Sequence, residues 1–408
     1  MDLGLRRVDS ALRVLGLTRP PCVVAHVVGT NGKGSVSLML SEIMRAHGLR
    51  VGLSTSPHFV SVRERVLVDG RMLSEATWTS LGNEVLAASS EAGLTYFEFI
   101  TVLAVAGFAR AGCDVVVMEA GLGGRYDAAS ALATDLTVFT SIGLDHTNVL
   151  GKTLAAIAGD KAGAMRKNVP AVSAPQLAEV REVLRVEATA VGAPFRDAPE
   201  VVDGVAAAAC PAMAGPHQRE NAQLALAAWI MLARRQGWAV DPAACDRAVG
   251  AARLPGRFQR VSGGPGEPEL ILDGAHNPPA MARLAETLAD QGLRPGAVIF
   301  ACMADKDLAT MASLVTGLSD GPLFLPVLPG NSRALSPEAA AAVLGPRAVP
   351  LPDLAAALER ARAVTGGPVL LCGSLYMLGE FFTLRPDCLV RQVPDIELPD
   401  GPDTGPAV

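Results

Sequence analysis

Blocks of apolar residues alternate along this chain with blocks of helical periodicity. Residues 21–28 are a valine-rich run typical of a strand buried on both faces, and residues 36–50 carry apolar side chains at helical spacing. We expect a short helix within residues 1–20. Further strands are predicted over 50–54, 114–118, 135–142 and 169–174, and helices over 74–110, interrupted at 94–99, and over 152–168. Residues 176–212 show only weak alternation, and a loop at 215–221 leads into an apolar helix over 222–234.

A second alternation of strands and helices begins after a turn-forming stretch at 253–259, which we interpret as an interdomain linker. Its predicted strands and helices are 269–273, 280–292, 296–303, 306–318, 321–327 and 368–382. The fold class is therefore α/β, with an N-terminal three-layer, P-loop-type domain on a mainly parallel sheet and a smaller Rossmann-like domain. We predict domains over 1–255 and 260–386, and a flexible tail over 387–408.

The first strand and helix enclose a glycine-rich loop, Gly29-Thr30-Asn31-Gly32-Lys33-Gly34-Ser35. Glycines let backbone N–H groups turn inward around an anion, and the helix that follows presents its positive end. Lys33 adds a cation and Ser35 a hydroxyl that can bind a metal ion. The spacing differs from the common phosphate-loop pattern because Gly34 stands between Lys33 and Ser35. The stretch nevertheless predicts a phosphate-binding loop.

Polar residues also follow two later strands. Glu119 ends the strand over 114–118, and His146 follows the strand over 135–142. The carboxyl ends of parallel strands meet at one edge of a sheet, so the loop, Glu119 and His146 are expected to share one crevice. This set suits Mg-ATP held for phosphoryl transfer. Lys161 lies at a helix centre where lysines usually face water, and His58 lies on a loop.

Composition narrows the functional classes. Half of the 408 residues are hydrophobic, yet no apolar run is long enough for a membrane span and no basic-then-apolar leader is present, so we expect a cytoplasmic protein. The net charge of −6 argues against a nucleic-acid partner. Seven cysteines are scattered without a C-x-x-C pair, which favours buried thiols over disulfides or zinc.

Several stretches together resemble folylpolyglutamate synthase and dihydrofolate synthase of the Mur ligase superfamily. They are GTNGKGS, STSPH, LTYFEF, MEAGLGGRYDA, LDHT, DKAG, GPHQRENAQLALAA, LPGRFQRV, DGAHNP, DKD and CGSLYMLGE, and they cover about residues 20–382. The resemblance implies an ATP-dependent amide ligase that adds L-glutamate to dihydropteroate, to glutamylated folates, or to both. It also implies a monomer.

The resemblance further implies roles for individual residues. Lys33 would contact the β and γ phosphates, Ser35 and Glu119 would hold one Mg²⁺, and His146 with a carbamylated Lys161 would hold a second. The resemblance also implies that a monovalent cation can bind. The nucleotide contacts would be Asn221, Arg257, Asp273 and His276. Near the pteroate pocket, the matching positions are Ser56, Pro57, His58, Thr95, Phe97 and Asp127.

Other interpretations are weighed against this one. A cell-wall Mur ligase would carry a domain ahead of the loop, whereas 28 residues precede Gly29. A cyanophycin-type ligase would need an additional ATP-handling domain. A nucleotide-binding module without catalysis would not be expected to keep Lys33, Glu119, His146 and Lys161 together. A ligase with only one of the two folate activities stays open.

Overall fold

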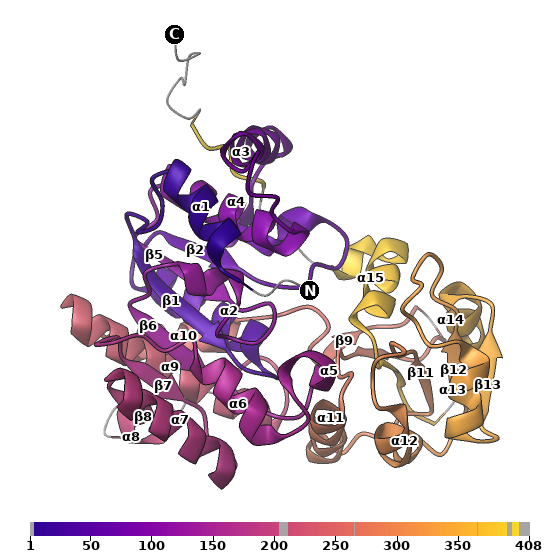
Figure 1. The fold of residues 1–408 in the computed structure, drawn as a ribbon. Coiled ribbons are helices and arrows are strands. Elements are labelled where there is room, and N and C mark those ends of the chain that lie inside the picture. Colours follow the sequence, from indigo (N-terminus) through magenta and orange to yellow (C-terminus); the bar gives the residue numbers. More distant parts are fainter. Residues whose placement is uncertain (1–3, 204–210, 265, 365, 390–393, 400–408) are drawn as a thin grey trace.

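The computed structural model contains two α/β units, each built on its own sheet (Figure 1). It describes residues 4–203, 211–264, 266–364, 366–389 and 394–399. The α/β class and the mainly parallel sheets predicted from the sequence are confirmed. Among the described helices, none is both long and apolar enough to cross a lipid bilayer.

The first sheet has eight strands in the order β4-β3-β2-β5-β1-β6-β7-β8. It is parallel from β2 to β8, and the hairpin of β3 and β4 adds an antiparallel edge. The turn at Asp69-Gly70 between β3 and β4 has positive φ at both residues, 50° and 76°, as a tight hairpin needs. The strands are β1 (Val23–Val28), β2 (Val51–Ser54), β3 (Val66–Val68), β4 (Arg71–Met72), β5 (Val115–Glu119), β6 (Leu136–Phe139), β7 (Ala171–Ser173) and β8 (Phe195–Asp197).

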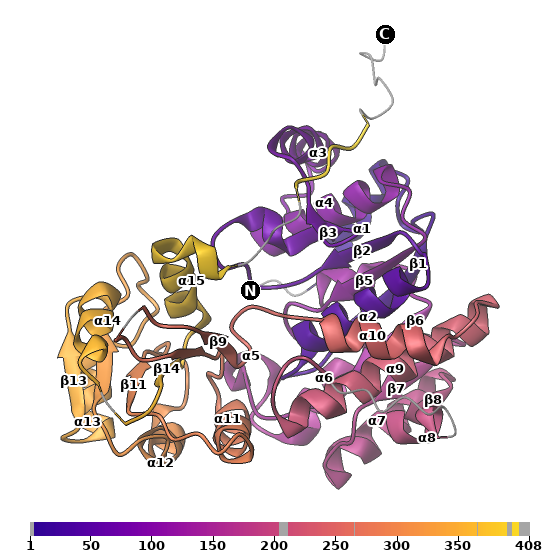
Figure 2. The same cartoon turned by 180° about the vertical axis from the view of Figure 1, so that it is seen from behind.

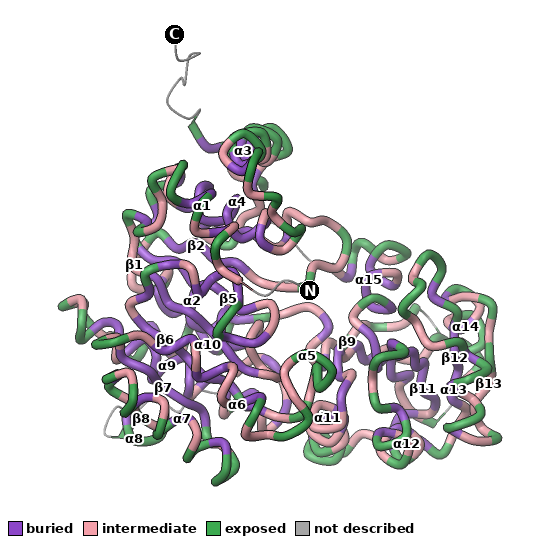
Figure 3. The backbone as a smooth tube through the Cα atoms, viewed as in Figure 1, coloured by how far each residue is buried: buried purple, intermediate pink, exposed green. Residues whose placement is uncertain are grey.

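Helices cover both faces of this sheet because its central strands are apolar on both sides. Val24 of β1 faces a core with α1, α3 and α4, whereas Ala25 and Val27 face a core with α2, α9 and α10. In Figure 3 the strands of this sheet are mostly buried and the outer helix faces are exposed. These helices are α1 (Arg6–Val14), α2 (Lys33–Ala46), α3 (Glu75–Ala88), α4 (Tyr96–Arg110), α9 (Pro216–Gln236) and α10 (Pro242–Ala251); α5 (Thr147–Leu150), α6 (Leu154–Ala162), α7 (Ala178–Val191) and α8 (Ala198–Val202) complete the unit.

The second sheet has six strands in the order β13-β12-β11-β14-β10-β9, and only β9 is antiparallel to its neighbour. Viewed from behind, β9 leads from the first unit into the second (Figure 2). The elements are β9 (Gln259–Val261), β10 (Leu270–Leu272), α11 (Pro278–Asp290), β11 (Ala297–Phe300), α12 (Leu308–Gly317), β12 (Leu323–Pro326), α13 (Pro337–Leu344), β13 (Ala348–Leu351), α14 (Leu354–Arg362), β14 (Val369–Cys372) and α15 (Leu375–Leu384).

Several local predictions were wrong. The weakly alternating stretch 176–212 contains helix α7. Its buried residues are Val180, Leu184 and Ala188, and so few buried positions give only a weak helical pattern in the sequence. Helix α9 begins at Pro216, so Asn221 lies in a helix and not in a loop. Helix α4 begins at Tyr96, inside the expected interruption at 94–99, because Thr95 caps it in a capping box with Glu98.

Part of the predicted flexible tail lies against the first unit. Residues 386–388 form a short 3-10 turn, and residues 394–399 lie on the first unit through a parallel bridge between Leu73 and Ile396. Leu398 is buried there in the core around α3 and α4. The other residues of 387–408 lie outside the described part. Of the seven cysteines, Cys210 also lies outside it, and the six that are described form no disulfide.

Candidate active site between the two units

The glycine-rich loop runs from the end of β1 to the first residue of α2. A Cβ at Gly29 would lie 1.9 Å from the Thr140 hydroxyl, and one at Gly32 would lie 2.5 Å from Oδ1 of Asn221. Gly32 also has a φ of +87°, which side chains rarely adopt. The loop therefore packs directly against the end of β6 and against α9, and only glycine fits at both positions.

Two lysines meet at the same carbonyl of this loop. The Lys33 ammonium donates to the Gly29 and Thr30 carbonyls at 3.2 and 3.1 Å, and the Lys161 ammonium donates to the Gly29 carbonyl at 2.8 Å. The helix residue Lys161 is buried, contrary to the usual solvent-facing lysine. Burial, and then the nearby positive charge of Lys33, lower the pKa of Lys161 to about 7. The neutral amine form of Lys161 is therefore well populated near neutral pH.

The predicted acid and histidine lie on either side of this loop. Glu119 ends β5, is buried, and accepts a hydrogen bond from the Ser56 N–H at 3.0 Å; burial raises its pKa. His146 precedes α5 with a φ of 51°, and burial lowers its pKa. Both line a small cavity of about 180 Å³ together with residues 29–34 of the loop and Lys161, whereas Ser35 lines a neighbouring cavity of about 130 Å³. The small cavity is polar, and both cationic and acidic side chains line it.

A divalent ion fits the donor set of this cavity. Within the described part of the chain, no three His, Cys, Asp or Glu side chains lie close enough to enclose an ion. Mg²⁺ needs no such enclosure, since it is usually held by one or two protein ligands together with phosphate oxygens and water. Glu119 supplies a buried carboxylate beside the phosphate loop, and the Ser35 hydroxyl lies in the first turn of α2.

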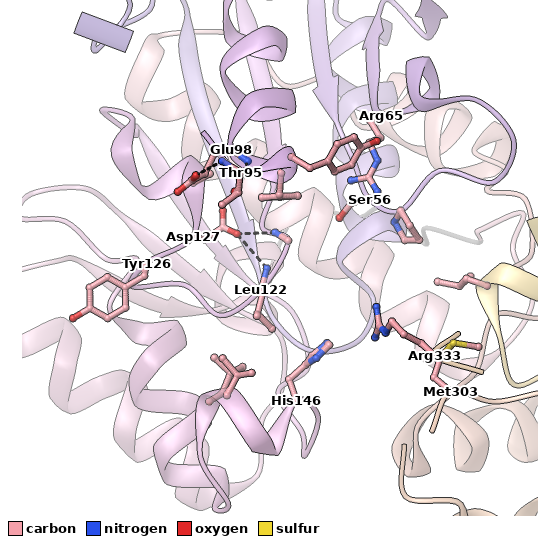
Figure 4. Close-up of a pocket in the computed structure, with 18 of the residues that line it drawn as sticks. Ser56, Arg65, Thr95, Glu98, Leu122, Tyr126, Asp127, His146, Met303 and Arg333 are labelled. Carbon is pink, nitrogen blue, oxygen red and sulfur yellow. Dashed lines mark hydrogen bonds between the residues drawn. The ribbon is translucent and has the colours of Figure 1, made fainter. Parts of the chain in front are cut away.

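A second, larger cavity of about 600 Å³ adjoins the first, and its walls are mainly apolar (Figure 4). Of the predicted substrate residues, Ser56, Pro57, Thr95, Phe97 and Asp127 line it. His58 is not among the lining residues, because its ring turns to Arg65, whose Nε donates to its Nδ1 at 2.9 Å. From the second unit, Met303, Arg333, Ser374 and Tyr376 complete the wall.

Asp127 shapes the wall of this cavity through backbone contacts. One carboxylate oxygen accepts the N–H groups of Gly121 and Leu122 at 2.8 and 3.2 Å, and the other accepts the N–H of Ala129 at 3.0 Å (Figure 4). These contacts hold the loop after β5 in a tight turn. Asp127 therefore positions the loop between the two cavities.

The predicted nucleotide contacts of both units line a third cavity of about 130 Å³. Asn221 comes from α9, and Arg257, Asp273 and His276 come from the linker and the second unit. Arg257 and His276 also line the small polar cavity. The Asp273 carboxylate accepts the N–H groups of Phe258 and Ala275 at 2.9 and 2.8 Å, so it fixes the turn that joins the units.

Sequence reasoning missed a cluster that joins the two units beside the phosphate loop. Asn31 and Asn277 exchange amide hydrogen bonds at 3.2 and 3.0 Å, and Asn277 also donates to Asp145 at 3.0 Å. The Lys306 ammonium lies 2.6 Å from the other Asp145 oxygen, and this pair holds the pKa of Asp145 well below its usual range. We call Asn31, Asp145, Asn277 and Lys306 the clasp. Asp145 and Lys306 lie in two of the stretches quoted above, but nothing local in the sequence pairs them.

Comparison with known protein families matches each unit to a Mur ligase domain. Residues 27–170 match the Mur ligase middle domain, and residues 256–375 match the Mur ligase glutamate ligase domain. The chain is 36% identical over 340 residues to the dihydrofolate synthase/folylpolyglutamate synthase of Escherichia coli, covering 78% of this chain and 77% of that protein.

The chain spans about half the length of two curated relatives from Halobacterium salinarum and Haloferax volcanii, both named probable bifunctional folylpolyglutamate synthase/dihydropteroate synthase. It is 36% and 34% identical to them, covering 87% and 92% of this chain but 46% and 48% of theirs.

Solved structures have the same fold. E. coli FolC in complex with DHPP and ADP superposes with a TM-score of 0.84 at 31% identity, covering 96% of this chain and 95% of that one. Mycobacterium tuberculosis folylpolyglutamate synthase complexed with ADP and AMPPCP superposes with a TM-score of 0.84 at 28% identity, covering 94% and 95%. The two-unit arrangement described above is therefore shared along nearly the whole chain.

Proposed function

The chain belongs to the folylpolyglutamate synthase/dihydrofolate synthase family of Mur ligases, and on that premise we propose that it joins L-glutamate to dihydropteroate and to glutamylated folates at the expense of ATP. The observation that carries this proposal is the shared wall of the two adjoining cavities. Ser56, Pro57, His146 and His276 line both the large apolar cavity and the small polar one. A flat aromatic acid held in the first would present its carboxylate to a phosphate in the second.

ATP would lie along the polar cavities. Its β and γ phosphates would face the loop from Gly29 to Ser35 and Lys33, because loop N–H groups and a helix start favour anions. Asn221 would meet the adenine, and Arg257, which lines both polar cavities, would meet the phosphates. Asp273 and His276 would reach the nucleotide from the second unit.

Ser35 and Glu119 would hold one Mg²⁺, and His146 with Lys161 would hold a second. Bound Mg²⁺ would screen the phosphate charges, which lets a carboxylate approach. A buried amine with a pKa of about 7 is neutral often enough to take up CO₂ as a carbamate, which would convert Lys161 into an anionic ligand. A monovalent cation belongs to the same proposal, with no residue assigned to it.

The reaction would proceed in two steps. A substrate carboxylate oxygen attacks the γ-phosphorus, the bond from phosphorus to the β,γ-bridging oxygen breaks, and ADP leaves. The neutral amine of glutamate then attacks the acyl carbon, the C–O bond to phosphate breaks, and the amine loses a proton as the amide forms. In this scheme Lys33 neutralises charge on the transferring phosphoryl group, and two residues that line the large cavity, Arg65 from the first unit and Arg333 from the second, offer cations to carboxylates.

We propose a monomer, as the family resemblance implies. We place the domain boundary between residues 255 and 260, because the last helix of the first unit ends at Ala251 and β9 begins at Gln259.

The test is ATP-dependent release of ADP and phosphate by the purified protein. Glutamate is offered with dihydropteroate, and separately with tetrahydrofolate, and the Lys33→Met variant serves as the blank. Turnover with both acceptors is expected. Turnover with only one would assign a monofunctional enzyme, and silence with both would refute the ligase proposal.

A further inference from the structure

The C-terminal segment 394–399 extends the edge of the first sheet. The Ile396 N–H donates to the Met72 carbonyl at 2.8 Å, and the Ser74 N–H donates to the Ile396 carbonyl at 2.9 Å. The Leu398 N–H donates to the Thr77 hydroxyl at 3.1 Å. In Figures 1 and 2 this segment runs beside α3, far from the second unit that precedes it in the chain. We call residues 394–399 the strap.

Two arginines of the first unit hold the strap. Arg71 donates to the carbonyls of Pro394 and Asp395, both at 2.8 Å. Arg63 pairs with the Asp395 carboxylate and also donates to the Leu73 carbonyl at 3.0 Å. The Arg63 side chain is 17% exposed, so this ion pair is partly screened from water. The Thr77 hydroxyl also donates to the Glu397 carboxylate at 3.4 Å, so the strap is fastened by its backbone and by two acidic side chains.

Arg63 belongs to the loop that forms one wall of the large cavity. It lies in the 3-10 turn Val62–Arg65 and is followed in the sequence by the buried Glu64. Glu64 accepts the N–H groups of Phe59, Val60 and Ser61 at 2.8 to 2.9 Å, which makes residues 59–65 one compact unit. Arg65 at the end of this unit lines the cavity and lies over the Tyr96 ring at 5.6 Å.

The other end of the same loop contacts the second unit. The Phe59 ring meets the Phe382 ring of α15 edge-on, with centroids 4.9 Å apart. Helix α15 immediately precedes the C-terminal stretch that ends in the strap. The end of the chain therefore holds the loop at two points, with Phe382 on the side of the second unit and Asp395 on the side of the first.

We propose that the strap is a positioning element for the acceptor substrate: through Asp395 and Arg63 it holds loop 59–65 so that Arg65 faces the large cavity. The identity of the acceptor rests on the function proposed above, but the mechanical link does not. Releasing the strap weakens acceptor binding more than ATP binding, because Lys33 donates to carbonyls of its own loop and Glu119 accepts from Ser56, which lies outside residues 59–65.

The experiment uses Asp395→Asn in the full chain, with Asp387→Asn as the matched control. Asp387 pairs with Arg385 on an exposed turn of the same C-terminal stretch. Asp395→Asn is expected to speed hydrogen exchange in residues 72–77 and 59–65 and to raise the KM for dihydropteroate about three- to fivefold. The KM for ATP should stay within about twofold, and Asp395→Glu should restore part of the acceptor KM. Ile396→Ser removes an apolar side chain that packs against the core around α3 and α4, and it should change hydrogen exchange and the acceptor KM in the same direction.

The two measurements separate this proposal from the proposed function. Faster exchange in 72–77 with unchanged exchange in 59–65 would show that the strap is not linked to the loop and would overturn the proposal. An equal rise in the KM values for ATP and acceptor would also overturn it. If the wild-type protein used neither folate acceptor, the proposed function would fail, while the exchange experiment would still decide whether the strap holds the loop.

Discussion

The two adjoining cavities of the site are built in different ways. The small polar cavity takes its loop from the residues after β1, its acid from the end of β5, its histidine from the loop after β6 and its lysine from α6, all within the first unit. The large apolar cavity takes its lining from α1, residues 56–65, α4, the loop after β5, α5 and α6, and from four segments of the second unit. Chemistry that depends on charge is therefore concentrated in a few side chains, whereas shape is shared by many.

This difference predicts that substitutions in the polar cavity abolish activity, while substitutions in the apolar cavity shift affinity. The clasp should fall between these extremes, because it sets how the two units meet without touching every substrate.

Lys33→Met should lower kcat by about 10³-fold, because a fixed cation facing the transferring phosphoryl group is lost. The exposed Lys167→Met is the matched control and should leave the rate unchanged. The measurement is steady-state ADP release at saturating substrates. A loss of less than tenfold would show that the loop does not hold the reacting phosphate.

Lys161→Ala should lower kcat by about 10²-fold, and added short-chain carboxylates such as acetate should restore part of the rate by occupying the vacated site. Chemical rescue is measured against acetate concentration, with Lys33→Met tested in parallel as a variant that acetate should not rescue. Full activity of Lys161→Ala would refute the carbamate.

Lys306→Met should lower kcat/KM by about 30-fold, since it leaves the Asp145 carboxylate, 10% exposed, without its cation. Asp145→Asn/Lys306→Met should be less impaired than Lys306→Met alone, because the double variant has no uncompensated charge. A double-mutant cycle on kcat/KM measures the coupling. Additive effects would show that the pair does not act together.

The stability of the ligand-free protein should rise with pH above about pH 7. The pKa of Lys161 is lowered to about 7 in the folded state, so between that value and its ordinary pKa near 10.5 the unfolded chain binds more protons than the folded one. The contribution is at most about 1.4 kcal/mol per pH unit. Urea unfolding at pH 7, 8 and 9 measures it, and the slope should flatten in Lys161→Met. An equal slope in both proteins would contradict the lowered pKa of Lys161.

Tyr96→Ala should raise the acceptor KM only two- to fourfold, about 0.5–1 kcal/mol, because it removes the ring under the Arg65 guanidinium at the cavity wall. Tyr96→Phe keeps the ring and should behave as wild type. Isothermal titration with dihydropteroate provides an independent measure. A loss of turnover with unchanged binding would mean that Tyr96 acts on the chemistry instead.

The sequence by itself was enough for the α/β class and for the residues that end buried strands. Glu119 and His146 follow apolar runs that are recognisable without any partner, and the loop from Gly29 to Ser35 is contiguous. Their convergence follows from one geometric rule, because parallel strands end at the same edge of a sheet. Elements with weaker signals were missed. Strand β13 is a half-buried edge strand with a proline, and α13 is a short alanine-rich helix.

Only the tertiary structure decided which distant residues meet. Asp145 and Lys306 are 161 residues apart, and Arg63 and Asp395 are 332 apart. Nothing near either member of these pairs predicts its partner. Burial of Lys161 is of the same kind, since its lowered pKa comes from burial by the surrounding fold and from the charge of Lys33 on the phosphate loop. Local periodicity determines strands, helices and their ends; contacts across the interface between two units depend on how whole sheets pack, which no short stretch encodes.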